Sequence, residues 1–239
     1  MKRVNTFVDY RTELVEESSK KAEAEIKVDE DKETAKLQSL IKIVHDEGEV
    51  AINVIPLATK PLTIVDWKIH KEGKKSYYQI IRADGSSKMY IVFSLMLKSF
   101  DREDLETLYK LIKAKYGLTR PVEDMDLILY GDLKTMFEPR VQDQIWKNQD
   151  NYSVLNWKLY DSCGVHSLRK QNVYIHMLVE KRYPLAPTTI TYMLDRKLQA
   201  DHWNEMCYHL LKLLTKQLKD QCSVWKHPLG DYGAFNEET

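Results

Sequence analysis

The stretch that decides the fold runs from Asp66 to Gly117 and reads DWKIHKEGKKSYYQIIRADGSSKMYIVFSLMLKSFDREDLETLYKLIKAKYG. Its first five residues, 66–70, alternate polar and apolar side chains, which predicts a strand with one buried face. A polar run around Gly73 follows and is typical of a hairpin turn. Residues 77–81 are aromatic or β-branched and predict a second strand. The stretch therefore begins as an antiparallel hairpin.

The middle of the stretch continues this pattern. Asp84-Gly85 is a strong turn dipeptide, so a second turn is expected there. Residues 89–97 are nearly all apolar and fit either a third strand or a short buried helix. Periodicity alone does not separate these two structures.

A helix is predicted next, because five apolar side chains recur at i, i+3, i+4, i+7 and i+11. They are Leu105, Leu108, Tyr109, Ile112 and Tyr116. Asp101 is placed to cap the first turn, and Phe100 precedes it at the spacing of a hydrophobic staple with Leu105. Glu106 stands four residues before Lys110, the spacing of a helical ion pair. Gly117 is expected to end the helix in a left-handed conformation.

The same pattern returns later in the chain. Residues 156–160 echo 66–70, and Gly164 stands in the position of the hairpin glycine. Residues 185–194 match 100–109 at a constant offset of 85. An internal hairpin–helix pseudo-repeat and a chance resemblance of two such units are both open alternatives.

Further helices are predicted between and after the two halves. Pro121 suits a first helical position, and an apolar face follows it. A short helix from Pro139 would bury Val141, Ile145 and Trp146. A last helix begins with Asp201 as its cap, and its apolar face is formed by Trp203, Met206, Cys207, Leu210, Leu213, Leu214 and Leu218.

These elements predict an α+β fold in which antiparallel hairpins form a curled sheet backed by helices. Residues 1–57 are rich in Glu, Lys, Ala and Ser and are expected to be a charged, largely disordered linker or tail. The folded domain is expected over residues 58–222. Its two halves are 62–117 and 152–200, and a helical bridge, 121–149, joins them. Residues 223–239 are expected to be a frayed tail.

The composition excludes several classes of protein. The chain of 239 residues holds 36 Lys and Arg against 36 Asp and Glu, so no global field attracts nucleic acid or lipid. No apolar run reaches the roughly 18–20 residues that span a bilayer, and the N-terminus lacks the apolar core of a signal peptide. Cys163, Cys207 and Cys222 are widely spaced and odd in number, which favours a reducing compartment. We expect an intracellular protein, in the cytoplasm or nucleus, with no membrane contact.

No catalytic or metal-binding constellation is recognised. The histidines and cysteines lack zinc-type spacing, so no metal and no cofactor are expected. Cys163-Gly164-Val165-His166 is the nearest approach to a nucleophile and base, but a turn residue beside a strand histidine explains it. Tyr130-Gly131-Asp132-Leu133 resembles a polymerase turn but lacks paired aspartates and sits in a helical pattern. We expect no enzymatic activity in this chain.

One local feature points to binding. Basic residues interleave with aromatic ones on adjacent predicted strands, an arrangement that can grip a phosphate backbone and stack bases. The candidate nucleic-acid contacts are Lys68, Lys71, Lys74, Lys75, Tyr77, Arg82 and Lys88. A solvated hairpin over an aromatic core is the alternative.

Four segments carry a resemblance to a known family. They are WKIHKEGKKSYYQIIRADGSSK (67–88), FDREDLETL (100–108), WKLYDSCGVH (157–166) and HMLVEKRYPL (176–185). These segments resemble an uncharacterised region of plant copia-type LTR retrotransposon open reading frames, and the similarity extends from Lys2 to about Lys219. The segments match no integrase, reverse transcriptase or ribonuclease H motif, so the resemblance assigns no functional residue. The family tends to carry a basic cluster before position 28, where this chain has Ala24-Glu25-Ile26-Lys27.

The resemblance implies a non-catalytic domain of a retrotransposon-derived polyprotein. Such a domain would act through contacts with nucleic acid or with other segments of the polyprotein. The alternative is a fragment of an enzyme polyprotein, an integrase or reverse transcriptase, whose catalytic parts lie outside this chain. A free-standing hydrolase that uses Cys163 or His166 is a third hypothesis.

Overall fold

The computed structural model describes residues 27–44, 62–117, 121, 124–147, 149, 153–171 and 173–224. The chain divides into two compact units, residues 1–40 and 41–239. In the first unit the described part contains a helix over residues 27–38. All elements named below belong to the second unit.

The second unit has an α+β fold, as the sequence predicts. Its described strands are β1 (Ile41–Ile43), β2 (Ile64–Glu72), β3 (Lys75–Arg82), β4 (Ser87–Tyr90), β5 (Val154–Tyr160), β6 (Val165–Lys170), β7 (Val173–Leu178) and β8 (Leu198–Ala200). Its described helices are α2 (Phe93–Ser99), α3 (Arg102–Tyr116), α4 (Asp124–Phe137), α5 (Gln144–Lys147), α6 (Pro187–Arg196) and α7 (Glu205–Val224).

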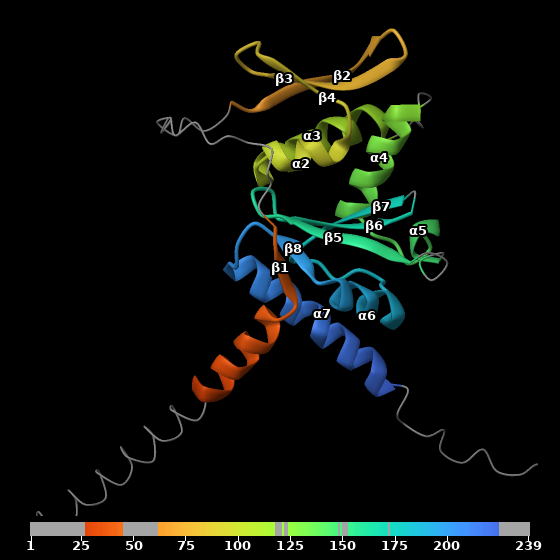
Figure 1. The fold of residues 1–239 in the computed structure, drawn as a ribbon. Coiled ribbons are helices and arrows are strands. Elements are labelled where there is room, and N and C mark those ends of the chain that lie inside the picture. Colours follow the sequence, from red (N-terminus) through yellow and green to blue (C-terminus); the bar gives the residue numbers. More distant parts are fainter. Residues whose placement is uncertain are drawn as a thin grey trace, which may run out of the picture. The chain divides into compact units, whose positions relative to one another are not determined.

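The elements of this unit form four layers (Figure 1). Strands β2, β3 and β4 make an antiparallel sheet, whose inner face covers α3. Helices α3 and α4 lie between this sheet and a second one of five strands, ordered β1-β8-β5-β6-β7. Helices α6 and α7 cover the other face of the five-stranded sheet. The sequence predicted one curled antiparallel sheet, whereas the described residues form two sheets, one antiparallel and one mixed.

The larger sheet is mixed because β8 pairs in parallel with both β1 and β5. Strand β1 falls within residues 1–57, which the sequence analysis interpreted as a linker. The two parallel strands are only three residues long, too short to show an alternating pattern. The remainder of the predicted linker before residue 27 and after residue 44, and nearly all of the predicted tail, lie outside the described residues.

Local sequence signals explain most elements of the first half. Gly73 (φ +60°) and Gly85 (φ +81°) take the left-handed backbone that their turns require. Segment 89–97, for which a strand and a helix were both open, contains the end of one and the start of the other. Strand β4 ends at Tyr90, and helix α2 begins at Phe93. The Asp101 side chain caps α3 by accepting a hydrogen bond from the Asp104 amide at 2.8 Å.

Three predictions about α3 and the bridge are wrong. Gly117 is right-handed (φ −60°), and a Cβ there would lie 2.6 Å from the Lys113 carbonyl oxygen, so close approach explains the glycine. Glu106 pairs with Arg102, four residues before it, at 3.1 Å. Val141 is 70% exposed because α5 begins only after it, although Trp146 is buried as predicted.

The two predicted halves share local geometry. Each begins with a strand whose register shifts just before a buried tryptophan, Trp67 in β2 and Trp157 in β5. Each first hairpin turn contains a left-handed glycine, Gly73 in one half and Gly164 in the other. Three antiparallel strands then precede a helix in both. The predicted hairpin–helix pattern therefore occurs twice, once in each sheet.

One hydrophobic core joins the halves. It contains the inner face of the three-stranded sheet and the buried faces of α3 and α4, together with Cys163, Val165 and Leu178 of the second half. The opposite face of the five-stranded sheet is covered by buried side chains of α6 and α7, such as Ile190 and Leu210. Among the described helices, none is long and apolar enough to cross a membrane.

The cap of the last helix differs from the prediction. Asn204, three residues after Asp201, accepts a hydrogen bond from the Cys207 amide at 2.9 Å, and α7 begins at Glu205. Asp201 is exposed in the preceding bend. Both residue types suit a cap, so sequence alone does not choose between them.

Replacing Asn204 tests the assigned start of α7. We expect Asn204→Ala to lower the free energy of unfolding by about 1 kcal/mol, because it leaves a first-turn amide of α7 without its acceptor. Asp201→Ala serves as the control and should change it by less than about 0.5 kcal/mol. Urea denaturation followed by circular dichroism measures both. Equal losses in the two variants would contradict the assignment.

Candidate functional site

Two histidines are buried in the five-stranded sheet. His166 on β6 is 1% exposed, and its Nδ1 accepts a hydrogen bond from Trp157 Nε1 at 3.1 Å. His176 on β7 is 5% exposed, and its Nδ1 lies 2.5 Å from Ser167 Oγ. Burial lowers the pKa of His176 to about 4, and burial together with the nearby His176 lowers the pKa of His166 to about 3. Both imidazoles are therefore neutral at pH 7.

Cys163 is buried in the turn before His166. Its Sγ lies 3.3 Å from the carbonyl oxygen of Leu97 and 3.7 Å from that of Tyr160, and donates to both. Burial raises the pKa of the thiol to about 12, so it stays protonated at neutral pH. The Cys163 thiol thus links the β5–β6 turn to α2 rather than presenting a thiolate.

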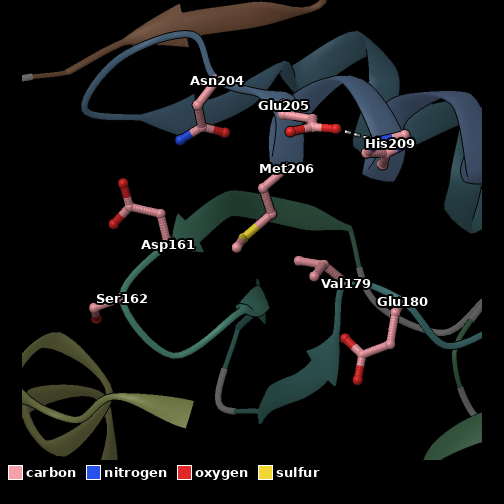
Figure 2. A pocket seen from close by; sticks show the side chains of 8 residues that line it. All are labelled: Asp161, Ser162, Val179, Glu180, Asn204, Glu205, Met206 and His209. Atoms are coloured by element: carbon pink, nitrogen blue, oxygen red, sulfur yellow. Dashed lines mark hydrogen bonds and ion pairs between the residues drawn. The ribbon is translucent and has the colours of Figure 1, made fainter.

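An acidic hollow of about 720 Å³ lies where the β5–β6 turn meets the start of α7 (Figure 2). Glu205 in its wall pairs with His209 at 3.2 Å, and Glu180 pairs with Arg102. His209 lies on α7, whereas His202 lies in the bend before it. Among the described residues no cluster of His, Cys, Asp and Glu can hold a metal ion.

The predicted basic and aromatic residues do not form one surface. Alternation along β2, β3 and β4 places ten side chains on the face away from α3, which we call the outer face. They are Asp66, Lys68, His70, Glu72, Lys75, Tyr77, Gln79, Ile81, Ser87 and Met89. Of the seven candidate nucleic-acid contacts, only Lys68, Lys75 and Tyr77 lie there.

The other four candidates lie elsewhere. Lys74 lies in the first hairpin turn and lines a cavity beside α4. Lys71 and Lys88 belong to the opposite face of the sheet, and the Lys88 ammonium lies 5.4 Å from the centre of the Tyr90 ring. These residues therefore do not share the outer face with Lys68, Lys75 and Tyr77, because successive side chains of a strand point to opposite faces of the sheet.

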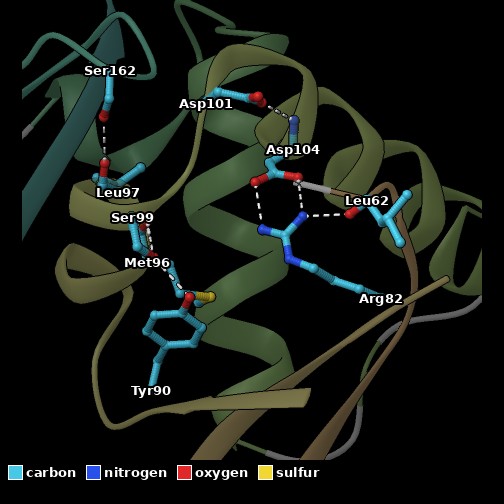
Figure 3. A network of polar contacts seen from close by, with 9 residues as sticks. All are labelled: Leu62, Arg82, Tyr90, Met96, Leu97, Ser99, Asp101, Asp104 and Ser162. Carbon is cyan, nitrogen blue, oxygen red and sulfur yellow. Dashed lines mark hydrogen bonds and ion pairs between the residues drawn. The ribbon is translucent and has the colours of Figure 1, made fainter. Parts of the chain in front are cut away.

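Arg82 forms hydrogen bonds with α3 and with the backbone that precedes β2 (Figure 3). Its Nη1 and Nη2 donate to the two carboxylate oxygens of Asp104 at 2.8 and 2.7 Å, and Nη1 also donates to the Leu62 carbonyl at 2.6 Å. The Asp104 side chain is only 5% exposed and that of Arg82 18%. The hydrogen bond to Asp104 raises the pKa of Arg82 further above its usual value. Arg82 therefore fastens the sheet to the helix and is not available to a ligand.

A cavity of about 530 Å³ lies on the inner side of the same sheet, and we call it the Asp132 cavity. It is lined by Lys74, Ser76, Tyr78, Ile91, Val92, Phe93, Ser94, Met125, Ile128, Asp132, Tyr174 and His176. Desolvation raises the pKa of Asp132 to about 7. The same burial, and the negative charges of Asp132 and Asp126, raise the pKa of Tyr78 to about 12.

Sequence analysis did not identify Asp132 as a binding residue, although the helix pattern contains a signal for it. Met125, Ile128 and Asp132 stand at i, i+3 and i+7, so an acid shares one helical face with two apolar residues. All three line the cavity. Burying a carboxyl within an apolar stripe costs free energy, so an acid at such a position is a candidate for a binding role.

Comparisons with protein-family models, with curated proteins and with solved structures found no match.

The two buried histidines predict a dependence of stability on pH. Their pKa values in the folded state lie below the ordinary value of 6.5, so the unfolded state binds protons first as the pH falls. Stability should be complete above about pH 6.5 and fall as the pH approaches 4. Each histidine should contribute a slope of up to about 1.4 kcal/mol per pH unit. Asp132, whose pKa is raised, contributes a slope of opposite sign in the same range and offsets one of them.

Urea denaturation at a series of pH values between 7 and 5 measures this slope. His176→Gln should lower this slope by about 1.4 kcal/mol per pH unit, because one of the two histidines no longer titrates. His202→Gln replaces an exposed histidine and should leave the slope unchanged. A stability that is flat between pH 7 and 5 would contradict the burial of the neutral imidazoles.

Proposed function

We propose that this chain is a non-catalytic domain of a retroelement-derived polyprotein that binds single-stranded nucleic acid through the outer face of β2–β4. The retroelement origin is supported by the four sequence segments that resemble copia-type reading frames. The binding function is supported by an aromatic pair with lysines beside it on an exposed sheet face.

The aromatic pair consists of Tyr77 and His70. They lie directly opposite each other in the β2–β3 register, so their Cβ atoms are about 5 Å apart. His70 is exposed and Tyr77 is half-buried, so both side chains reach solvent. Two adjacent flat side chains on a sheet can stack successive bases of a single strand.

Lysines extend this pair along each strand. Lys68 stands two residues from His70, and Lys75 stands two residues from Tyr77, so all four side chains share the outer face. Asp66 and Glu72 share that face as well, so the positive potential is confined to the neighbourhood of the two lysines. The Lys68–Asp66 pair spans 3.8 Å between exposed groups and is weak in water, so phosphate competes well for the ammonium.

The experiment is fluorescence anisotropy of the full chain with labelled oligo(dT) and oligo(U) across a salt series. Two phosphate contacts predict that log affinity falls with log salt with a slope of about −1.4 on single strands. Lys68→Glu/Lys75→Glu should abolish most of the binding. Tyr77→Ala should weaken binding roughly tenfold with little change of slope, because stacking does not release counterions.

The control is Lys216→Glu/Lys219→Glu, which makes the same change of charge on exposed positions of α7. This control should bind like the unmodified chain. Absence of binding at low salt, or equal weakening by the two double variants, would overturn the nucleic-acid proposal. A domain that works through protein contacts would then be the better interpretation.

A further inference from the structure

The Asp132 cavity has features that the proposed nucleic-acid function does not use. It lies on the inner side of β3, opposite to Lys68 and Tyr77, and both halves of the fold contribute to it. Tyr78 comes from the first sheet, Asp132 from α4, and Tyr174 and His176 from β7 of the second sheet. The two sites are thus physically separate.

Exposed apolar side chains surround this cavity. Ile91 is 47% exposed, Val92 46%, Ile128 56% and Tyr174 45%, and all four line it. Large apolar residues that are exposed singly are common, but a group of them around one hollow marks an interaction site. The walls therefore favour a ligand with an apolar portion.

The carboxyl of Asp132 lacks a partner within the part of the chain that the structure describes. No hydrogen bond or ion pair joins it to another described residue, although its neighbours desolvate it enough to raise its pKa to about 7. A desolvated carboxyl is stabilised by a cation or by a strong hydrogen-bond donor. Phosphate would be repelled, so a nucleic acid is a poor occupant.

Aromatic rings provide a second preference for a cation. Tyr78 and Tyr174 line the cavity together with His176, whose imidazole stacks on Tyr174 with ring centres 6.1 Å apart. Ring faces attract ammonium and guanidinium groups, most strongly where water is excluded. Lys74 stands at the hairpin turn as the one basic residue among the lining side chains.

We propose that the Asp132 cavity binds an arginine or lysine side chain of a partner protein. The aliphatic stem of such a side chain packs against Val92 and Ile128, and its charged head reaches Asp132. Arginine and lysine are the side chains that combine an apolar stem with a cationic end. The cavity is larger than one side chain, so residues beside the basic one are accommodated too.

The experiment is an NMR titration of the ¹⁵N-labelled full chain with three small probes. They are N-acetyl-arginine methylamide, N-acetyl-lysine methylamide and the neutral N-acetyl-norleucine methylamide. The basic probes should shift amide resonances of the cavity with a Kd on the order of 1 mM, as expected for a single side chain. Norleucine should bind roughly tenfold more weakly, because it lacks the charge-assisted hydrogen bond.

Two variants of α4 make the test specific. Asp132→Asn keeps the shape of the side chain and should weaken the arginine probe to the level of norleucine. Asp124→Asn removes an exposed acid from the same helix and should leave binding unchanged. Ile128→Ser, at the exposed rim, should weaken all three probes together.

Three outcomes would overturn the proposal. They are equal binding of norleucine and arginine probes, unchanged binding by Asp132→Asn, and no shift of cavity resonances with any probe. A further arm uses n-butylguanidinium, which is a free cation without a peptide. Binding of this cation tenfold more tightly than the arginine probe would assign the cavity to small organic cations instead of a partner protein.

Discussion

The paired hydrogen bonds between Arg82 and Asp104 connect the three-stranded sheet to the rest of the second unit. Arg82 ends β3 and Asp104 lies in the first turn of α3, so the pair fixes both the position and the direction of the sheet on the helix. A nearly buried carboxylate is tolerated because both oxygens accept charge-assisted hydrogen bonds. The inner face of the sheet, with Trp67 and Ile80, then closes the core.

The junction of the two halves contains neutral polar groups as well as the Arg102–Glu180 ion pair. The Tyr183 hydroxyl donates to the Met136 carbonyl of α4 at 2.6 Å and accepts from the Leu178 amide of β7 at 2.8 Å. Cys163 and His166 are likewise engaged by backbone or ring partners. Such satisfied groups order the interface at little electrostatic cost. Asp132 differs from them, since it is desolvated without a described partner, and for that reason it is the residue to which we assign recognition.

The sequence predicted what local patterns encode. The periodicity of α3 and its Asp101 cap are contained in one short segment, and both are confirmed. The parallel pairing of β1 with β8 joins two three-residue strands far apart in the chain, so no local pattern predicted it. Arg82 was assigned to a binding surface because alternation separates the two faces of a strand without showing which face a helix will cover. The α4 pattern places Asp132 on an apolar helix face, but the cavity around it also needs residues of β7, which no local pattern predicts.

The most direct test of the Arg82–Asp104 connection is hydrogen exchange of the backbone amides in Asp104→Ala, compared with Lys110→Ala at an exposed position of the same helix. Removing Asp104 leaves Arg82 without its main partner and should destabilise the attachment of the sheet by about 3 kcal/mol. We predict that amides of β2–β4 lose protection while those of β5–β7 keep it, and that Lys110→Ala changes neither sheet. Unchanged protection of β2–β4, or equal loss in both sheets, would contradict the central place of the Arg82–Asp104 pair.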